Sequence, residues 1–388
     1  MTPVIALAAL MLLFAFSEFI AMKTHATISS VLALAVLFLA GFWSGVLPKD
    51  IFETTGIKTF GTLIAGLLIT SLATTLDFAE MKRQVKVIII SLLGLAGGTA
   101  LIFAVGYAFH MFDFALAGSP IFAGGSAATL LITTALDGKG YELIITYCLG
   151  LLIFQKFVGI PIASYCLKKE ARQFISQPHM SEQYSRQEHD QKKSKRKLLE
   201  IPQSQQKAST YLAKLACVAG LSYVLAGLTH GVIHFFVMCL ILGAVAYYLG
   251  FLESGILQKT QSDGLIMFLV TVLIFSNLSS VTPSMIAQII LPLILFMTMG
   301  VVGVLTVSYI AGRVMRMSPY LAMALGISCT FGFPTTLVMP QEVAASVATN
   351  DTEKQAIENY LVPKMLVAGI ITVTVASVLM AGAVIHYF

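Results

Sequence analysis

Two glycine-rich segments carry the residue types and the spacing best suited to binding chemistry. They read GGSAATLL and GFPTTLVM, and each interrupts an apolar stretch. Glycine and proline break helices and leave backbone N–H and C=O groups without partners, so in lipid this backbone must be buried in protein or line a wet cavity. Paired interruptions at matching positions in two halves indicate a transporter site; tight packing of small-residue helices is the alternative. We predict that substrate binds at Gly124, Gly125, Ser126, Thr129, Gly332, Pro334, Thr335 and Thr336.

Two lysines lie in the apolar runs that follow these segments. Lys156 stands within CLGLLIFQKFVGIP, whereas Lys364 follows the polar stretch 350–359. Placing an ammonium group in a membrane costs at least about 2 to 3 kcal/mol, so each lysine is a functional candidate. Because burial favours the neutral amine, we predict that these lysines couple transport to H⁺. The alternative is that their charged ends reach the membrane interface.

The third apolar block of each half ends in hydroxyl and amide side chains, the oxygen donors that a small cation such as Na⁺ prefers. Hydroxyls at helix ends also bond their own backbone, which is the alternative interpretation. An amide in an apolar run needs a partner, so the asparagine is the stronger candidate. The predicted coupling-ion ligands are Thr74, Thr75, Ser276 and Asn277.

The composition excludes a water-soluble enzyme and a disordered chain. Of the 388 residues, 57% are hydrophobic and 11% are charged, whereas a soluble domain carries about 25% charged residues. The net charge of +5 is concentrated in one loop, so we expect no nucleic-acid partner. The five cysteines form no C-x-x-C pair, so we predict neither a disulfide nor a metal site. Nucleophile triads and nucleotide-binding motifs are lacking, so we predict no enzyme activity and no cofactor beyond the coupling ion.

Hydropathy divides the chain into a first membrane repeat (1–167), a basic cytoplasmic linker (168–208) and a second membrane repeat (209–388). His25 pairs with His230 and Gly45 with Gly250, and the two glycine-rich segments follow at nearly the same separation. A re-entrant fifth block in each half gives five transmembrane helices plus one hairpin per repeat, and the repeats are then inverted. This topology places most Lys and Arg on the linker side. We predict an all-α polytopic membrane protein with both termini outside.

The chain resembles the bacterial sodium/glutamate symporter family. That family carries a Gly-Gly-His-Gly-Thr type motif in one loop and a Pro-Thr step in the other, and Gly124–Thr129 and Gly332–Thr336 occupy the matching places. LVPKMLVAG resembles its final helix, and bile-acid/sodium symporter-like and 2-hydroxycarboxylate transporters are comparable relatives. The resemblance implies a mobile core of hairpins and following helices that moves against a scaffold. Ser126 replaces the motif histidine, and a fixed lysine charge would repel Na⁺.

From these features we predict a secondary active transporter of a small organic anion, a carboxylate or an amino acid, coupled to H⁺ and working by an elevator-like movement. One alternative is a Na⁺-coupled glutamate or carboxylate symporter, in which the lysines are structural ties. Another is a non-coupled channel-like or regulatory membrane protein. The predicted location is the bacterial cytoplasmic (inner) membrane, and a homodimer is a candidate assembly.

Overall fold

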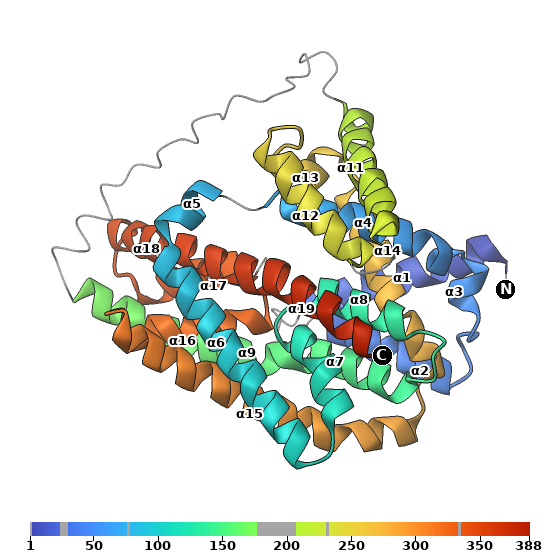
Figure 1. The fold of residues 1–388 in the computed structure, drawn as a ribbon, viewed down its shortest axis with the longest axis horizontal. Coiled ribbons are helices and arrows are strands. Elements are labelled where there is room, and N and C mark those ends of the chain that lie inside the picture. Colours follow the sequence, from blue (N-terminus) through green and yellow to red (C-terminus); the bar gives the residue numbers. More distant parts are fainter. Residues whose placement is uncertain (1, 24–29, 76–77, 177–206, 230–232, 333–334) are drawn as a thin grey trace.

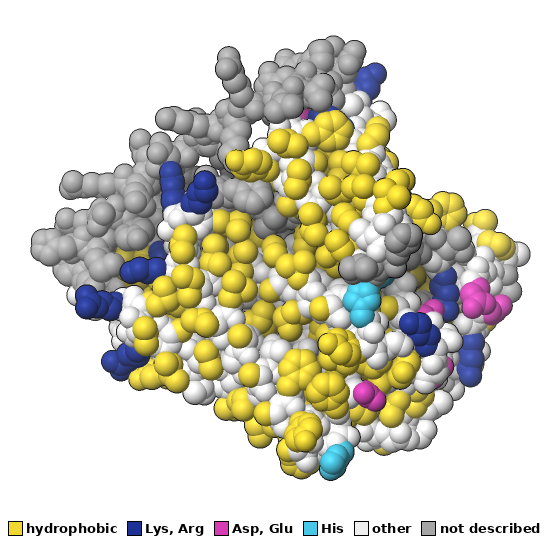
Figure 2. All heavy atoms as spheres, in the orientation of Figure 1, with side chains coloured by type: hydrophobic (Ala, Val, Ile, Leu, Met, Phe, Trp, Pro, Cys, Tyr) yellow, Lys and Arg dark blue, Asp and Glu magenta, His cyan; other side chains and the backbone are white. Residues whose placement is uncertain are grey.

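The protein is an all-α polytopic membrane protein (Figure 1). A computed structural model describes residues 2–23, 30–75, 78–176, 207–229, 233–332 and 335–388, and every regular element in these ranges is helical. Large apolar side chains lie on the outside as well as in the core, as Figure 2 shows for one face. Only lipid tolerates so continuous an apolar surface.

Seven helical segments in the described ranges are long and apolar enough to cross a bilayer: 3–20, 85–108, 142–175, 208–228, 263–280, 283–314 and 351–387. The other three predicted spans are shorter apolar helices, the two 14-residue helices α2 (Ser30–Trp43) and α12 (Phe235–Tyr248) and the 17-residue helix α4 (Ile57–Ala73). A 14-residue helix is about 21 Å long, which is less than the roughly 30 Å hydrocarbon core. The short helices α2 and α12 occupy equivalent places in the two halves.

The two halves contain the same series of elements. The first half holds α1 (Pro3–Lys23), α2, α3 (Ile51–Thr54), α4, α5 (Phe78–Arg83), α6 (Val85–Ala108), α7 (Phe112–Phe122), α8 (Ser126–Leu136) and α9 (Glu142–Ile175). The second holds α11 (Ala208–Leu228), α12, α13 (Ile256–Lys259), α14 (Asp263–Phe275), η2 (Ser276–Ser280), α15 (Pro283–Val314), α16 (Pro319–Ile327), η3 (Ser328–Thr330), α17 (Thr335–Val347), α18 (Asp351–Gly369), η4 (Ile370–Ala376), α19 (Ser377–Val384) and η5 (Ile385–Tyr387). Among these, α5 of the first half and the short segments η2, η3, η4 and η5 of the second half lack counterparts.

Local backbone geometry repeats with the element order. Gly45 and Gly250, which the sequence comparison pairs, have φ angles of 75° and 83°. The ends of α6 and α15 are also alike, because His110 and Arg316 have φ angles of 55° and 56°. In both places the next N–H donates to a glycine carbonyl five residues back, at 2.8 Å. Left-handed non-glycine residues are uncommon, so their recurrence at matching positions supports a structural repeat.

The helices form two groups (Figure 1). In one group, called the scaffold here, α1 to α4 pack with α11 to α14. In the other, called the core, α6 to α9 pack with α15 to α19. Within the core α6 lies along α15, and a Cβ added at Gly303 would lie 2.5 Å from the carbonyl oxygen of Gly97. Glycine is required at this crossing because the two backbones touch.

Two helical hairpins lie inside the core, and each packs against helices of both halves. Hairpin 1 (α7 and α8) packs on α9 of its own half and on α19 of the other half. Hairpin 2 (α16, η3 and α17) packs on α18 of its own half and on α9 of the other half. The long helix α9 continues to Ile175, eight residues past residue 167, where the first repeat was predicted to end. This helix therefore touches both hairpins and reaches the start of the linker, of which residues 177–206 lie outside the described ranges.

Candidate functional site

The interruption in each hairpin falls at the predicted glycines. Hairpin 1 breaks between α7 and α8, where Gly125 has φ 66° and ψ −139°, a conformation that favours glycine. A Cβ added at Gly124 would overlap the side chain of Ser377. Hairpin 2 breaks after η3, where Gly332 has φ +58° and an added Cβ would lie 2.7 Å from Val373. The predicted site residue Pro334 lies outside the described residues.

Both hairpin tips meet the same short stretch of the final helix. Gly332 lies against Val373, and Gly124 lies against Val373 and Ser377. Val373 belongs to η4, a seven-residue π-helical segment between α18 and α19. The Ser377 hydroxyl donates to the Val373 carbonyl at 2.5 Å and lies beside Gly124 at the tip of hairpin 1. Segments of π-helix inside α-helices are often found at functional sites, and this one brings the two hairpin tips together.

The N-terminus of α8 presents donors at the tip of hairpin 1. Its N-cap is Gly125, which has no side chain to cap the helix. The N–H groups of Ser126, Ala127 and Ala128 consequently have no acceptor within the helix. Ala127 and Ala128 are buried and Ser126 is exposed, and the Thr129 hydroxyl donates back to the Gly125 carbonyl at 2.9 Å. Uncapped N–H groups and the helix dipole together favour an anion.

The N-terminus of α17 occupies the corresponding place in hairpin 2. Thr335 is half-buried and Thr336 is fully buried. The N–H of Thr336 donates to the Gly332 carbonyl at 3.0 Å, which closes the first turn. Its hydroxyl oxygen is buried and has no hydrogen-bond partner among the described residues. Thr336 packs against Gly369, where an added Cβ would lie 2.6 Å from the threonine Cγ2.

The two lysines that the sequence analysis pairs are held differently. Lys156 on α9 is half-buried, and no hydrogen bond or ion pair joins it to another described residue. Lys364 on α18 is 9% exposed, and its Nζ donates to the Tyr360 carbonyl at 2.6 Å. The same Nζ lies 4.0 Å from the centre of the Tyr360 ring, within cation–π range. The carbonyl and the ring of Tyr360 therefore stabilise the charge of Lys364, whereas no such contact stabilises Lys156.

Glu170 is a buried carboxylate that the sequence analysis assigned to the linker. It is 4% exposed on the last turns of α9. Its Oε1 accepts from the Tyr360 hydroxyl at 2.8 Å, and its Oε2 accepts from the Ser318 hydroxyl at the start of α16. The carboxylate therefore ties α9 to the base of hairpin 2 and to α18. In the sequence, the only feature that marks Glu170 is its place directly after two lysines, Lys168 and Lys169.

The predicted cation ligands donate to their own helices. The hydroxyls of Thr74, Thr75 and Ser276 each donate to a carbonyl three residues earlier, at 2.7 Å. Thr74 and Thr75 follow α4, which packs on α11, α12 and α14 in the scaffold, so they are not grouped with the hairpin tips. Asn277 is half-buried on η2, and η2 packs on α2 and α9. Asn277 thus lies where the scaffold meets the core.

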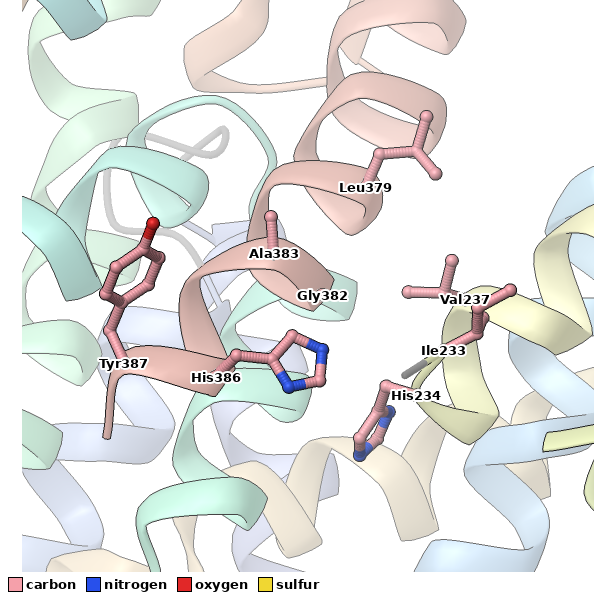
Figure 3. Close-up of a pocket in the computed structure, with 8 residues that line it drawn as sticks. All are labelled: Ile233, His234, Val237, Leu379, Gly382, Ala383, His386 and Tyr387. Atoms are coloured by element: carbon pink, nitrogen blue, oxygen red, sulfur yellow. The ribbon is translucent and has the colours of Figure 1, made fainter. Parts of the chain in front are cut away.

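An open hollow lies between the scaffold and the core, and no residue of the hairpin tips lines it (Figure 3). Its volume is about 500 cubic ångströms. Residues at the start of α12 line one wall, and α19 and η5 line the other. Its titratable side chains are His234, His386 and Tyr387. The His234 Nδ1 accepts from the Phe236 N–H at 3.2 Å. Burial lowers the pKa of His234 below its ordinary value, and the nearby His386 lowers it further.

A second hollow of about 430 Å³ runs between α6 and the η4–α19 segment and is mostly apolar. Neither hollow contains a residue of the predicted substrate site. The described residues of the hairpin tips instead pack against the final helix at Val373 and Ser377.

No protein-family model matches this sequence, and no curated protein matches it significantly. The site geometry is therefore the basis for the function proposed below.

Proposed function

We propose that the protein is an H⁺-coupled secondary transporter of a small organic anion. The observation that carries the proposal is the uncapped N-terminus of α8, next to the tip of hairpin 1, which packs on Val373 of η4 as the tip of hairpin 2 does. Such a site binds a carboxylate through backbone N–H groups, without a fixed ion pair. It lies inside the core, where broken helices are protected from lipid.

The two helix groups support an elevator-like movement. The core carries both hairpins, and it meets the scaffold through α2, α12, α14 and η2. A hollow of about 500 cubic ångströms lies along this boundary beside α12 and α19, which still touch at Val237 and Gly382. Because the core packs mainly on itself, it can shift as a unit past the scaffold and carry the bound anion from one side to the other.

The distribution of charge supports the cytoplasmic assignment of the linker. The last turns of α5, α9 and α15 carry Lys82, Arg83, Arg172 and Arg313. These helix ends gather at one end of the core, because α5 packs on α18 while Ser318 and Tyr360 both bond Glu170. In Figure 2, Lys and Arg line the left edge, whereas acidic and basic side chains mix at the right edge. Positive charge marks the cytoplasmic side.

Lys156 is the proposed proton carrier. It is half-buried and has no ion-pair partner among the described residues, so its charge is stabilised only when an anion binds nearby. An anion bound at the hairpin tips favours the ammonium form, and release of the anion favours loss of the proton. Substrate and proton are thereby bound and released together.

One observation favours the Na⁺-coupled alternative. Lys364 is engaged by Tyr360, as expected of a structural tie, and Asn277 lies next to α9. A Na⁺ ion held by Asn277 and backbone carbonyls would then replace the proton as the coupling ion.

Reconstituted transport separates these possibilities. We would screen carboxylates and amino acids by thermal shift of the purified protein, and measure uptake of the compounds that stabilise it into proteoliposomes. We expect accumulation driven by a pH gradient without Na⁺, and its loss in Lys156→Ala, with Lys139→Ala, an exposed lysine, as the control. Accumulation driven by Na⁺ at fixed pH would contradict H⁺ coupling. Equilibration without accumulation would contradict secondary transport.

A further inference from the structure

Gln155 is the most deeply buried polar side chain of α9 beside the hairpin tips. It is 1% exposed, and neither its amide oxygen nor its amide nitrogen has a hydrogen-bond partner among the described residues. An unpaired buried donor or acceptor is costly, and native proteins seldom leave both ends of one amide unpaired. Bulk water does not reach either atom, because each has essentially no accessible surface. The amide of Gln155 is therefore available to hydrogen-bond a further polar group.

The position of Gln155 on α9 shows where this partner binds. Leu152 touches the tip of hairpin 1, since an added Cβ on Gly125 lies 4.0 Å from its side chain. Gly159 touches hairpin 2, where an added Cβ would overlap Thr330. Residues three, four and seven apart share one face of a helix, so Gln155 lies on the α9 face between these two contacts. Lys156 adjoins it on the same face.

A second orphaned polar group lies at the tip of hairpin 2. The buried hydroxyl of Thr336 also has no partner among the described residues. Thr336 is the second residue of α17, and α17 packs directly on α9. Two unsatisfied polar groups thus accompany the uncapped N-terminus of α8, on three elements that pack around the hairpin tips. Each of the three offers a polar group that a ligand at the hairpin tips could pair.

We propose that Gln155 binds the transported substrate directly, together with Thr336, and that it selects a substrate with a hydrogen-bond donor beside its carboxylate. This inference rests on the proposed transport function. A carboxamide presents one acceptor and two donors, so a plain carboxylate leaves the amide oxygen unpaired. The carboxylate of the substrate accepts hydrogen bonds from the N–H groups of α8. A hydroxyl or ammonium group next to that carboxylate donates to the Gln155 oxygen.

Isosteric variants distinguish a substrate contact from a structural one. Gln155→Leu and Thr336→Val remove the orphaned groups and nearly keep the side-chain volume. Thr99→Val is the matched control, because the Thr99 hydroxyl is also buried and unpaired but lies on α6 beside the second hollow. Ligands would be added in pairs that differ in one group, such as malate with succinate and L-glutamate with glutarate. The readouts are the unfolding temperature without ligand, the affinity for each ligand and its uptake.

A substrate role predicts that all three variants fold as stably as the wild type, or more stably, without ligand. Gln155→Leu should weaken binding of the hydroxy or amino member of a pair about 10-fold to 100-fold and remove the preference over its plain partner. Thr99→Val should leave binding unchanged. A destabilised Gln155→Leu with unaltered ligand preference would overturn the inference and leave transport intact. If no compound in the panel binds or is transported by the wild type, the proposed function fails and the inference fails with it.

Discussion

Replacing Gly332 with alanine tests whether the tip of hairpin 2 packs against the π-helical segment η4. The substitution has two free-energy costs, backbone strain at Gly332 and steric overlap with Val373. At φ +58° an alanine is strained by about 1 to 2 kcal/mol. Its Cβ would also lie 2.7 Å from one methyl group of Val373 and 3.1 Å from the other, and overpacking of this kind costs about 1 to 3 kcal/mol. The expected loss of stability is therefore about 2 to 5 kcal/mol.

The two costs can be measured apart in a double-mutant cycle. Val373→Ala removes both methyl groups, so Gly332→Ala in that background should keep the strain and lose most of the clash. We expect a coupling of about 1 to 3 kcal/mol between the two substitutions. Gly220→Ala is the control, because this helical glycine has open space around it, and alanine there should stabilise α11 by about 0.5 to 1 kcal/mol.

The four buried cysteines, Cys148, Cys166, Cys239 and Cys329, provide the assay. A thiol-reactive dye labels them only as the protein unfolds, in a Cys217→Ser background that removes the exposed thiol. With about 2 °C per kcal/mol for a large domain, Gly332→Ala should unfold about 4 to 10 °C below its parent. An unchanged unfolding temperature, or a loss that Val373→Ala does not reduce, would refute the contact between hairpin 2 and η4.

Three further expectations follow from the structure. Because burial and His386 lower the pKa of His234, the unfolded chain binds more protons than the folded one, so stability present above about pH 6.5 is lost as the pH falls. His234→Asn, which keeps an N-cap, should reduce that acid-induced drop in unfolding temperature, and an equal drop would contradict it. Glu170→Leu removes the acceptor of the Tyr360 and Ser318 hydroxyls and should cost about 1 to 3 kcal/mol of stability, which an unaltered thermal unfolding curve would disprove. Cysteines placed at Lys139 and Thr349 should react with an impermeant maleimide from opposite sides of the membrane; labelling from one side would rule out two opposed hairpins.

Sequence patterns predicted the helical architecture and the positions of the helix breaks. Long apolar runs can only be helices in lipid, and the glycines at 124–125 and 332 occur where the helices are interrupted. Gly45 and Gly250, which the sequence pairs as equivalent positions of a repeat, both have left-handed backbone. These features are local, because each depends on a few consecutive residues and on their conformational preferences.

Contacts between distant segments were not available from the sequence. Glu170 belongs to a basic stretch by composition, and only the three-dimensional arrangement brings Ser318 and Tyr360 to its oxygens. The apolar run around Gln155 shows that the residue enters the membrane but does not show which face of α9 meets the hairpins. The sequence allowed the hydroxyls of Thr74 and Ser276 to be either cation ligands or donors to their own helix backbone. In the structure both donate to backbone carbonyls of their own helices.

The two halves differ beside the hairpins, at positions that the sequence comparison pairs. Gln155 and Lys156 on α9 correspond to Pro363 and Lys364 on α18. Pro363 offers no side-chain hydrogen bond, and Lys364 is held by Tyr360, whereas the Gln155 amide has no described partner. A substrate with chemically different ends cannot fit a two-fold symmetric site, so the repeat has to be broken where the substrate binds. Under the proposed transport function, Gln155 of the first half selects the substrate together with Thr336 of the second half, while Lys364 stays held by Tyr360.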